Sequence, residues 1–96
     1  MAEIPSLLGV TGDHHGYTLG AAVYSPQDQP SGARYLMVQS ITQATYYTLD
    51  GSTPSATNGF LLLTTQAPVL LPAGGNVVFK FLRAASGAIL QYQWIK

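Results

Sequence analysis

The 96-residue sequence contains no cysteine. A disulfide or a cysteine-based zinc site therefore cannot stabilise the fold, and nothing points to an oxidising compartment. Charged residues are also scarce: they make up 8% of the chain, against roughly 25% in a typical soluble domain, and their formal sum is zero. Small soluble monomers usually keep some net charge, which holds them apart in solution. We therefore expect a partner to cover much of the surface.

Two further absences exclude classes of partner. The four basic residues are scattered along the chain, and phosphate binding needs clustered Lys and Arg, so we expect no nucleic acid partner. No apolar run approaches the roughly 20 residues that span a bilayer, so we expect no membrane partner. The start of the chain carries Glu3 and Pro5 and lacks a basic region, unlike a signal peptide. We expect a protein made in the cytoplasm.

The first 33 residues differ in composition and hydrophobic pattern from the rest of this short, single-domain chain. They are rich in Gly and Pro and have no sustained hydrophobic period, so we predict an extended, loop-rich N-terminal arm over residues 1–33, with a short strand within 17–24. Such a segment buries little against itself and must lie on its own domain or on a neighbour. The predicted partner-binding anchors in the arm are Ile4, Leu7, Leu8, Val10 and Tyr17.

Residues 34–96 are typical of β-structure. We predict strands over residues 34–41, 44–50, 59–63, 67–72, 77–84 and 88–96. In the last two strands apolar residues alternate, which places Phe79 with Phe81 and Tyr92 with Trp94 on core-facing sides. Several short strands separated by turn signals predict a small antiparallel β-sandwich or barrel, Ig-like or jelly-roll-like, of about six to seven strands.

The cluster "TGDHHGY", residues 11–17, has the residue types of a metal site. On an extended segment His14 and His15 point to opposite sides, so one chain supplies too few ligands and a turn is favoured. A hydrolase triad can be drawn from Ser52, His14 and Asp50, but no G-x-S-x-G motif supports it. We therefore expect no enzymatic activity, no metal and no cofactor.

Four aromatic residues admit two interpretations. Tyr46, Tyr47, Tyr92 and Trp94 could form a platform on which sugar rings stack, or they could fill the core or an interface. A small domain needs most of its aromatic side chains buried to be stable, which favours the second interpretation.

The stretch "YYTLDGSTPSATNGFLL", residues 46–62, predicts a rigid turn between two strands. Gly51 adopts positive φ at no cost, and the Asp50 carboxylate can accept backbone N–H groups. Pro54 ends strand pairing, and Gly59 restarts a strand that carries Phe60 into the core. The predicted structural corner comprises Asp50, Gly51, Pro54, Gly59 and Phe60. Its polar tip, residues 52–58, is a predicted contact surface.

This corner also carries two resemblances. The segment "YYTLDGSTPS" resembles a Y-T-x-D-G-S-x-P turn of Ig-like modules appended to chitobiase-type glycosidases. Over residues 33–94, "ARYLMVQSITQATYYTLDGSTPSATNGFLL" followed by "VVFKFLRAASGAILQYQW" resembles small virion-associated structural proteins of tailed bacteriophages. The second resemblance implies architectural roles for the corner residues and for Gly87, Gln91 and Trp94 in a closing hairpin.

The phage resemblance implies a capsid decoration or cement protein on the virion surface. Such a protein would bind across subunits of the major capsid protein and form a homo-oligomer, a dimer or a trimer. A neck or tail structural protein and a carbohydrate-binding module are the alternatives. We expect that removal of residues 1–30 leaves the β domain folded but weakens binding to the particle.

Overall fold

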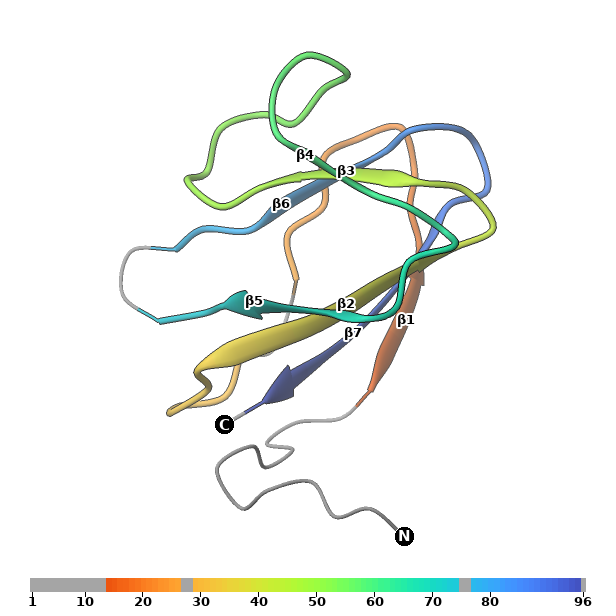
Figure 1. Ribbon diagram of the computed structural model, residues 1–96. Coiled ribbons are helices and arrows are strands. Elements are labelled where there is room, and N and C mark those ends of the chain that lie inside the picture. Colours follow the sequence, from red (N-terminus) through yellow and green to blue (C-terminus); the bar gives the residue numbers. More distant parts are fainter. Residues whose placement is uncertain (1–13, 27–28, 75–76, 96) are drawn as a thin grey trace, which may run out of the picture.

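The computed structural model describes residues 14–26, 29–74 and 77–95, and the chain in these ranges is all β (Figure 1). Its seven strands are β1 (His15–Thr18), β2 (Tyr35–Ile41), β3 (Thr45–Thr48), β4 (Phe60–Leu62), β5 (Val69–Pro72), β6 (Lys80–Arg83) and β7 (Ile89–Ile95). They pair antiparallel in two sheets, one of order β1-β7-β2-β5 and one of order β4-β3-β6. The sheets face each other, which confirms the predicted small β-sandwich.

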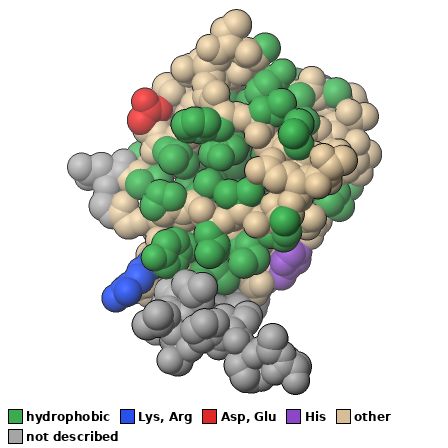
Figure 2. Space-filling model, viewed as in Figure 1, with side chains coloured by type: hydrophobic (Ala, Val, Ile, Leu, Met, Phe, Trp, Pro, Cys, Tyr) green, Lys and Arg blue, Asp and Glu red, His purple; other side chains and the backbone are tan. Residues whose placement is uncertain are grey.

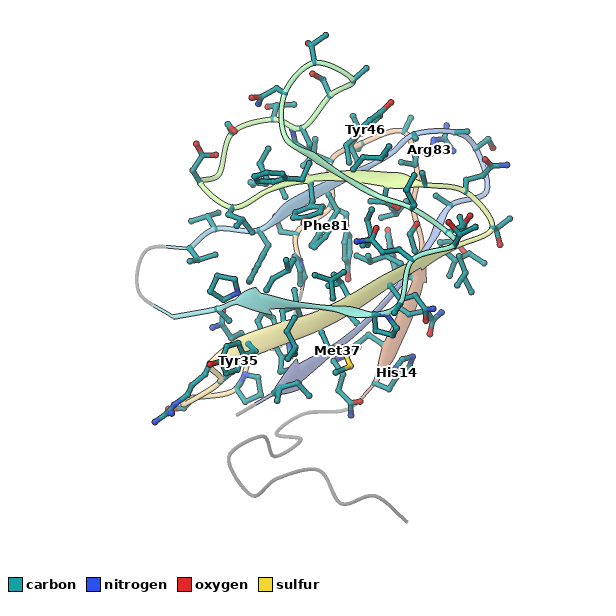
Figure 3. The ribbon with its side chains drawn as sticks, in the orientation of Figure 1. His14, Tyr35, Met37, Tyr46, Phe81 and Arg83 are labelled. Carbon is teal, nitrogen blue, oxygen red and sulfur yellow. The ribbon has the colours of Figure 1, made fainter. Side chains whose placement is uncertain are left out.

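The core lies between the two sheets and follows the period-2 pattern of the strands. The β2–β7 register pairs Leu36 with Trp94 and Val38 with Tyr92, and all four side chains are buried. Phe81 of β6 reaches the same interior from the opposite sheet (Figure 3). The predicted core positions Phe79, Phe81, Tyr92 and Trp94 are therefore confirmed. Replacement of one such aromatic residue by Ala typically costs about 3–5 kcal/mol.

The predicted closing hairpin is wrong. β6 pairs with β3, whereas β7 pairs with β1 and β2 in the other sheet. The segment between them, with Gly87 at a φ of 97°, crosses from one sheet to the other. Alternation of apolar residues shows which side of a strand is buried, but it does not show which strand pairs with it. Two strands of one sheet and two strands of facing sheets have the same alternating pattern. The sequence pattern therefore could not separate a hairpin from a crossing.

The described part of the predicted arm belongs to the β domain. β1 pairs with β7, and Leu19 is 1% exposed. Tyr24 exchanges two backbone hydrogen bonds of 2.8 Å with Phe81. A domain boundary at residue 33 is therefore not supported, and removal of residues 1–30 would delete a strand and a core residue.

The break between the second and third predicted strands is a tight connection between sheets. The Gln43 N–H donates to the Ile41 carbonyl at 2.9 Å, across Thr42, whose φ is 74°. Beneath this turn the buried hydroxyls of Ser40 and Thr45 lie 2.7 Å apart, and Ser40 Oγ donates to the Gln43 carbonyl at 2.6 Å. Because each hydroxyl has a partner, this polar pair joins the sheets without an unsatisfied group.

Candidate functional site

The loop over residues 49–59 joins β3 to β4, which are antiparallel neighbours. The carboxylate of Asp50 accepts the Ser52 backbone N–H at 3.0 Å and the Ser52 hydroxyl at 2.6 Å. Gly51 has a φ of 82°, and its N–H donates to the Val78 carbonyl at 3.0 Å. These contacts confirm the predicted turn at Asp50 and Gly51, and they anchor the loop to the segment before β6.

Two further residues fix the shape of this loop. Pro54 is fully buried although it lies in a loop. Gly59 has a φ of 110°, and a Cβ at this position would lie 2.5 Å from the carbonyl oxygen of Tyr47. Only glycine fits such a position without displacing backbone. The corner is therefore a preformed structure, as the sequence predicts.

The prediction that Phe60 enters the core is wrong. β4 begins at Phe60 as expected, but the side chain is 60% exposed, and Leu62 supplies the buried residue of the strand at 1% exposure. The Phe60 ring lies against Tyr47, with a centroid distance of 5.5 Å. Alternation places Phe60 and Leu62 on the same side of β4, but it does not show whether the facing sheet extends over each of these side chains.

The corner forms an open hollow of about 390 Å³ on the surface. It is lined by Thr48, Leu49, Asp50, Ser52, Asn58, Gly59 and Phe60. The amide nitrogen of Asn58 donates to Ser52 Oγ at 3.2 Å and to the Thr53 carbonyl at 2.9 Å, which holds this side chain in place. The two hydrogen bonds from Ser52 lower the pKa of Asp50, so the carboxylate is charged at neutral pH. The hollow therefore offers oriented hydrogen-bond acceptors beside an exposed aromatic ring.

The structure separates the residues of the hypothetical triad and metal cluster. His14 contacts the Gln91 side chain on the outer face of the four-stranded sheet, whereas His15 stacks on the buried Tyr92 ring at 4.8 Å. The two histidines thus point to opposite sides, as predicted. Ser52 and Asp50 are neighbours at the corner, away from His14. Within the described ranges, no three His, Asp or Glu side chains gather as a metal site would require.

The four aromatic residues do not form a common platform. Trp94 and Tyr92 are each 1% exposed and belong to the core, while Tyr46 and Tyr47 are half-buried in the other sheet. Burial raises the pKa of the Tyr47 phenol. The core-filling interpretation is confirmed for Tyr92 and Trp94.

Of the predicted arm anchors, only Tyr17 lies within the described residues. It sits in β1 and stacks on Tyr24 with a centroid distance of 4.1 Å, so it is part of the domain. Ile4, Leu7, Leu8 and Val10 lie outside the described residues. No helix long and apolar enough to cross a membrane occurs in the described ranges.

Comparison of the chain with models of protein families, with characterised proteins and with solved structures gives no match. Function must therefore be inferred from the sequence resemblance and from the surface of this structure.

One surface feature was not predicted from the sequence, namely a group of exposed apolar side chains. Phe60, Leu61, Leu63 and Leu70 are exposed on or beside β4 and β5. A readable signal accompanies them, because the stretch from Gly51 to Phe79 contains no Asp, Glu, Lys, Arg or His. Figure 2 shows hydrophobic side chains gathered over this side of the sandwich.

Proposed function

We propose that this chain is a non-enzymatic structural protein of a tailed-phage virion. In this role it is a capsid decoration or cement protein that binds across subunits of the major capsid protein. The observation that carries the proposal is the architectural use of the residues that bear the phage resemblance. Asp50, Gly51 and Gly59 shape a preformed corner, and Trp94 lies in the core on β7.

The surface supports the same role. A protein that stays bound in a multi-subunit shell needs apolar contact area more than it needs surface charge. This chain has few charged residues, and exposed leucines lie beside its edge strands. In a shell with many copies, modest affinity per copy suffices, because neighbouring contacts reinforce one another.

The test is binding of the purified full chain to capsids that lack it. We expect the protein to sediment with expanded or mature capsids, and we expect density for the chain on the outer surface of the particle. Decorated heads should also withstand heating better than bare heads. A folded protein that neither binds capsids nor appears in purified particles would contradict the proposal.

A neck or tail location is the nearest alternative, and copy number separates it from decoration. A decoration protein covers the head in numbers that follow those of the capsid subunits, whereas a neck or tail ring holds far fewer copies. Quantitative mass spectrometry of purified particles gives this ratio directly.

Carbohydrate binding is a second candidate, favoured only by the hollow at the corner. There the Asp50 carboxylate and the Asn58 amide stand beside the exposed Phe60 ring, an arrangement suited to sugar hydroxyls and to the apolar face of a sugar ring. A glycan array with the wild-type chain and Phe60→Ala tests it. A glycan signal that is lost in the variant would favour this candidate, and a blank array would reject it.

A further inference from the structure

The hollow at the corner brings together a charged group, an aromatic ring and polar side chains that are held in place. Its volume of about 390 Å³ lies near the lower end of the roughly 300–1,000 Å³ that is typical of ligand pockets. Figure 2 shows an acidic side chain beside a group of hydrophobic side chains on one face of the molecule. The hollow is therefore of a size to take a small group or a single side chain, and its chemistry shows which kind.

Every side-chain hydrogen-bond donor in the lining of the hollow is already used within the corner. The Thr48 hydroxyl donates to the Ser52 carbonyl, and the Ser52 hydroxyl donates to Asp50 Oδ1 at 2.6 Å. The Asn58 side-chain nitrogen donates to Ser52 Oγ at 3.2 Å and to the Thr53 carbonyl at 2.9 Å. The other lining residues have no side-chain donor. The side chains of the hollow therefore offer a ligand acceptors only.

Two side-chain oxygens of the lining keep acceptor capacity. Both hydrogen bonds from Ser52 go to Oδ1 of Asp50, so Oδ2 of this carboxylate takes part in neither. Asn58 uses its nitrogen for both of its hydrogen bonds, which leaves its carbonyl oxygen as an acceptor. Asp50 is charged at neutral pH because Ser52 lowers its pKa, and no side chain of the lining is positive. The hollow thus combines a negative charge with two oriented acceptors.

The Phe60 ring adds a second attraction for a positive charge. Its side chain is 60% exposed, and the ring packs against Tyr47 at a centroid distance of 5.5 Å. The face of an aromatic ring attracts a cation, and the planar guanidinium group of arginine also stacks on it. An exposed ion pair alone contributes little to binding. The carboxylate and the ring together therefore favour a cation that is planar.

We propose that this hollow binds the guanidinium group of an arginine side chain on a partner protein. A guanidinium has five N–H donors and no acceptor, so it can donate to Asp50 and Asn58 in its plane while its face lies on Phe60. A sugar hydroxyl brings lone pairs that find no side-chain donor here, and so does the carboxylate of free arginine. This contact is separate from the apolar contact proposed for the capsid, so either proposal can fail alone.

The first experiment titrates the isotope-labelled full chain with the peptide acetyl-Gly-Arg-Gly-amide and follows the backbone amide shifts by NMR. We expect saturable shifts at Ser52, Asn58 and Phe60. The same peptide with neutral citrulline in place of arginine should bind at least about fivefold more weakly, because it keeps the shape and loses the charge. Free arginine, the lysine peptide and methyl glucoside should also bind more weakly. Equal affinity for any of these four probes, or shifts confined to other residues, would overturn the proposal.

The second experiment tests the carboxylate and the ring one at a time. Asp50→Asn removes the charge but keeps an oxygen for the Ser52 N–H, and Phe60→Leu removes the ring at an exposed position. We expect each to weaken binding of the arginine peptide by at least about threefold. Leu70→Ala is the control, since Leu70 is 38% exposed and lies outside the lining.

Thermal unfolding shows that each of these variants is folded. Wild-type affinity for the arginine peptide in folded Asp50→Asn or Phe60→Leu would contradict the proposed site. A loss of affinity in Leu70→Ala as large as in these two variants would do the same, because it would place the peptide outside the hollow.

Discussion

At the scale of single residues, Gly59 is the position where the corner depends most on one amino acid. Gly59→Ala would force a Cβ to within 2.5 Å of the Tyr47 carbonyl oxygen at a φ of 110°. We expect a loss of about 2–3 kcal/mol in the free energy of unfolding, measured by urea denaturation. The control is Gly20→Ala, because a Cβ at Gly20 has no neighbouring atom within 4 Å. Equal stability of the two variants would show that the corner relaxes freely.

Asp50 gives a prediction about pH. Ser52 lowers the pKa of Asp50 in the folded chain, so the stabilisation from this carboxylate is present above the unfolded pKa and is lost as pH falls through the folded pKa. In Ser52→Ala we expect the pKa of Asp50 to rise towards its ordinary value, as measured by NMR titration of the carboxyl carbon. The melting temperature should fall most at neutral pH, and the difference from the wild type should narrow in acid, where only the hydrogen bond from Asn58 to Ser52 Oγ is still lost. Thr53→Ala, at a neighbouring exposed position, should leave the pKa of Asp50 unchanged.

Residue-level predictions from sequence succeed where one local rule decides the outcome. The Asp50–Gly51 turn follows from side-chain chemistry and glycine conformation, and Trp94 follows from the alternation of its strand. The prediction for Phe60 fails because the burial of this side chain depends on how far the opposite sheet extends. That extent is a tertiary property which no local pattern contains.

At the scale of elements, the sequence predicts that strands exist better than it predicts how they pair. All six strands predicted beyond residue 33 are present with shorter bounds, and the one predicted within 17–24 is displaced to His15–Thr18. β6 and β7 lie in different sheets although their sequence reads as a hairpin. Pairing is decided by long-range contacts, whereas the turn signal between them is local.

Truncation tests the placement of β1. Removal of residues 1–13 should leave a folded domain, because β1 begins at His15 and its partners lie in β7. Removal of residues 1–24 should abolish cooperative unfolding, since it also deletes Leu19 and the Tyr24–Phe81 bridge. Near-UV circular dichroism and thermal melts distinguish the two. A shorter chain that still melts cooperatively would show that β1 is dispensable.

The first truncation also isolates the predicted arm. If residues 1–13 anchor the chain to its partner, their removal should reduce capsid binding while the fold persists. Unchanged capsid binding would place the anchor elsewhere on the domain.

At the scale of the whole molecule, the exposed apolar side chains on and beside β4 and β5 could not be predicted from the sequence, because their exposure depends on which strands end the two sheets. The scarcity of charged residues can be read from the sequence and predicts a partner, but it does not indicate a particular face. The strand order, which puts β4 and β5 at the ends of their sheets, is needed to locate these exposed side chains.

The same lack of charge predicts how the complex responds to salt. The residues that the structure describes include four charged side chains, Arg34, Asp50, Lys80 and Arg83, and none of them lies in β4 or β5. Ion pairs between exposed groups are largely screened in about 1 M salt, whereas apolar contacts are not. We therefore expect the Kd of this chain for capsids to stay within about twofold, or to tighten, as NaCl is raised to that level. Weakening by about tenfold or more would indicate that ion pairs hold the chain on the capsid, and it would place the contact on a charged surface instead of on the exposed leucines of β4 and β5.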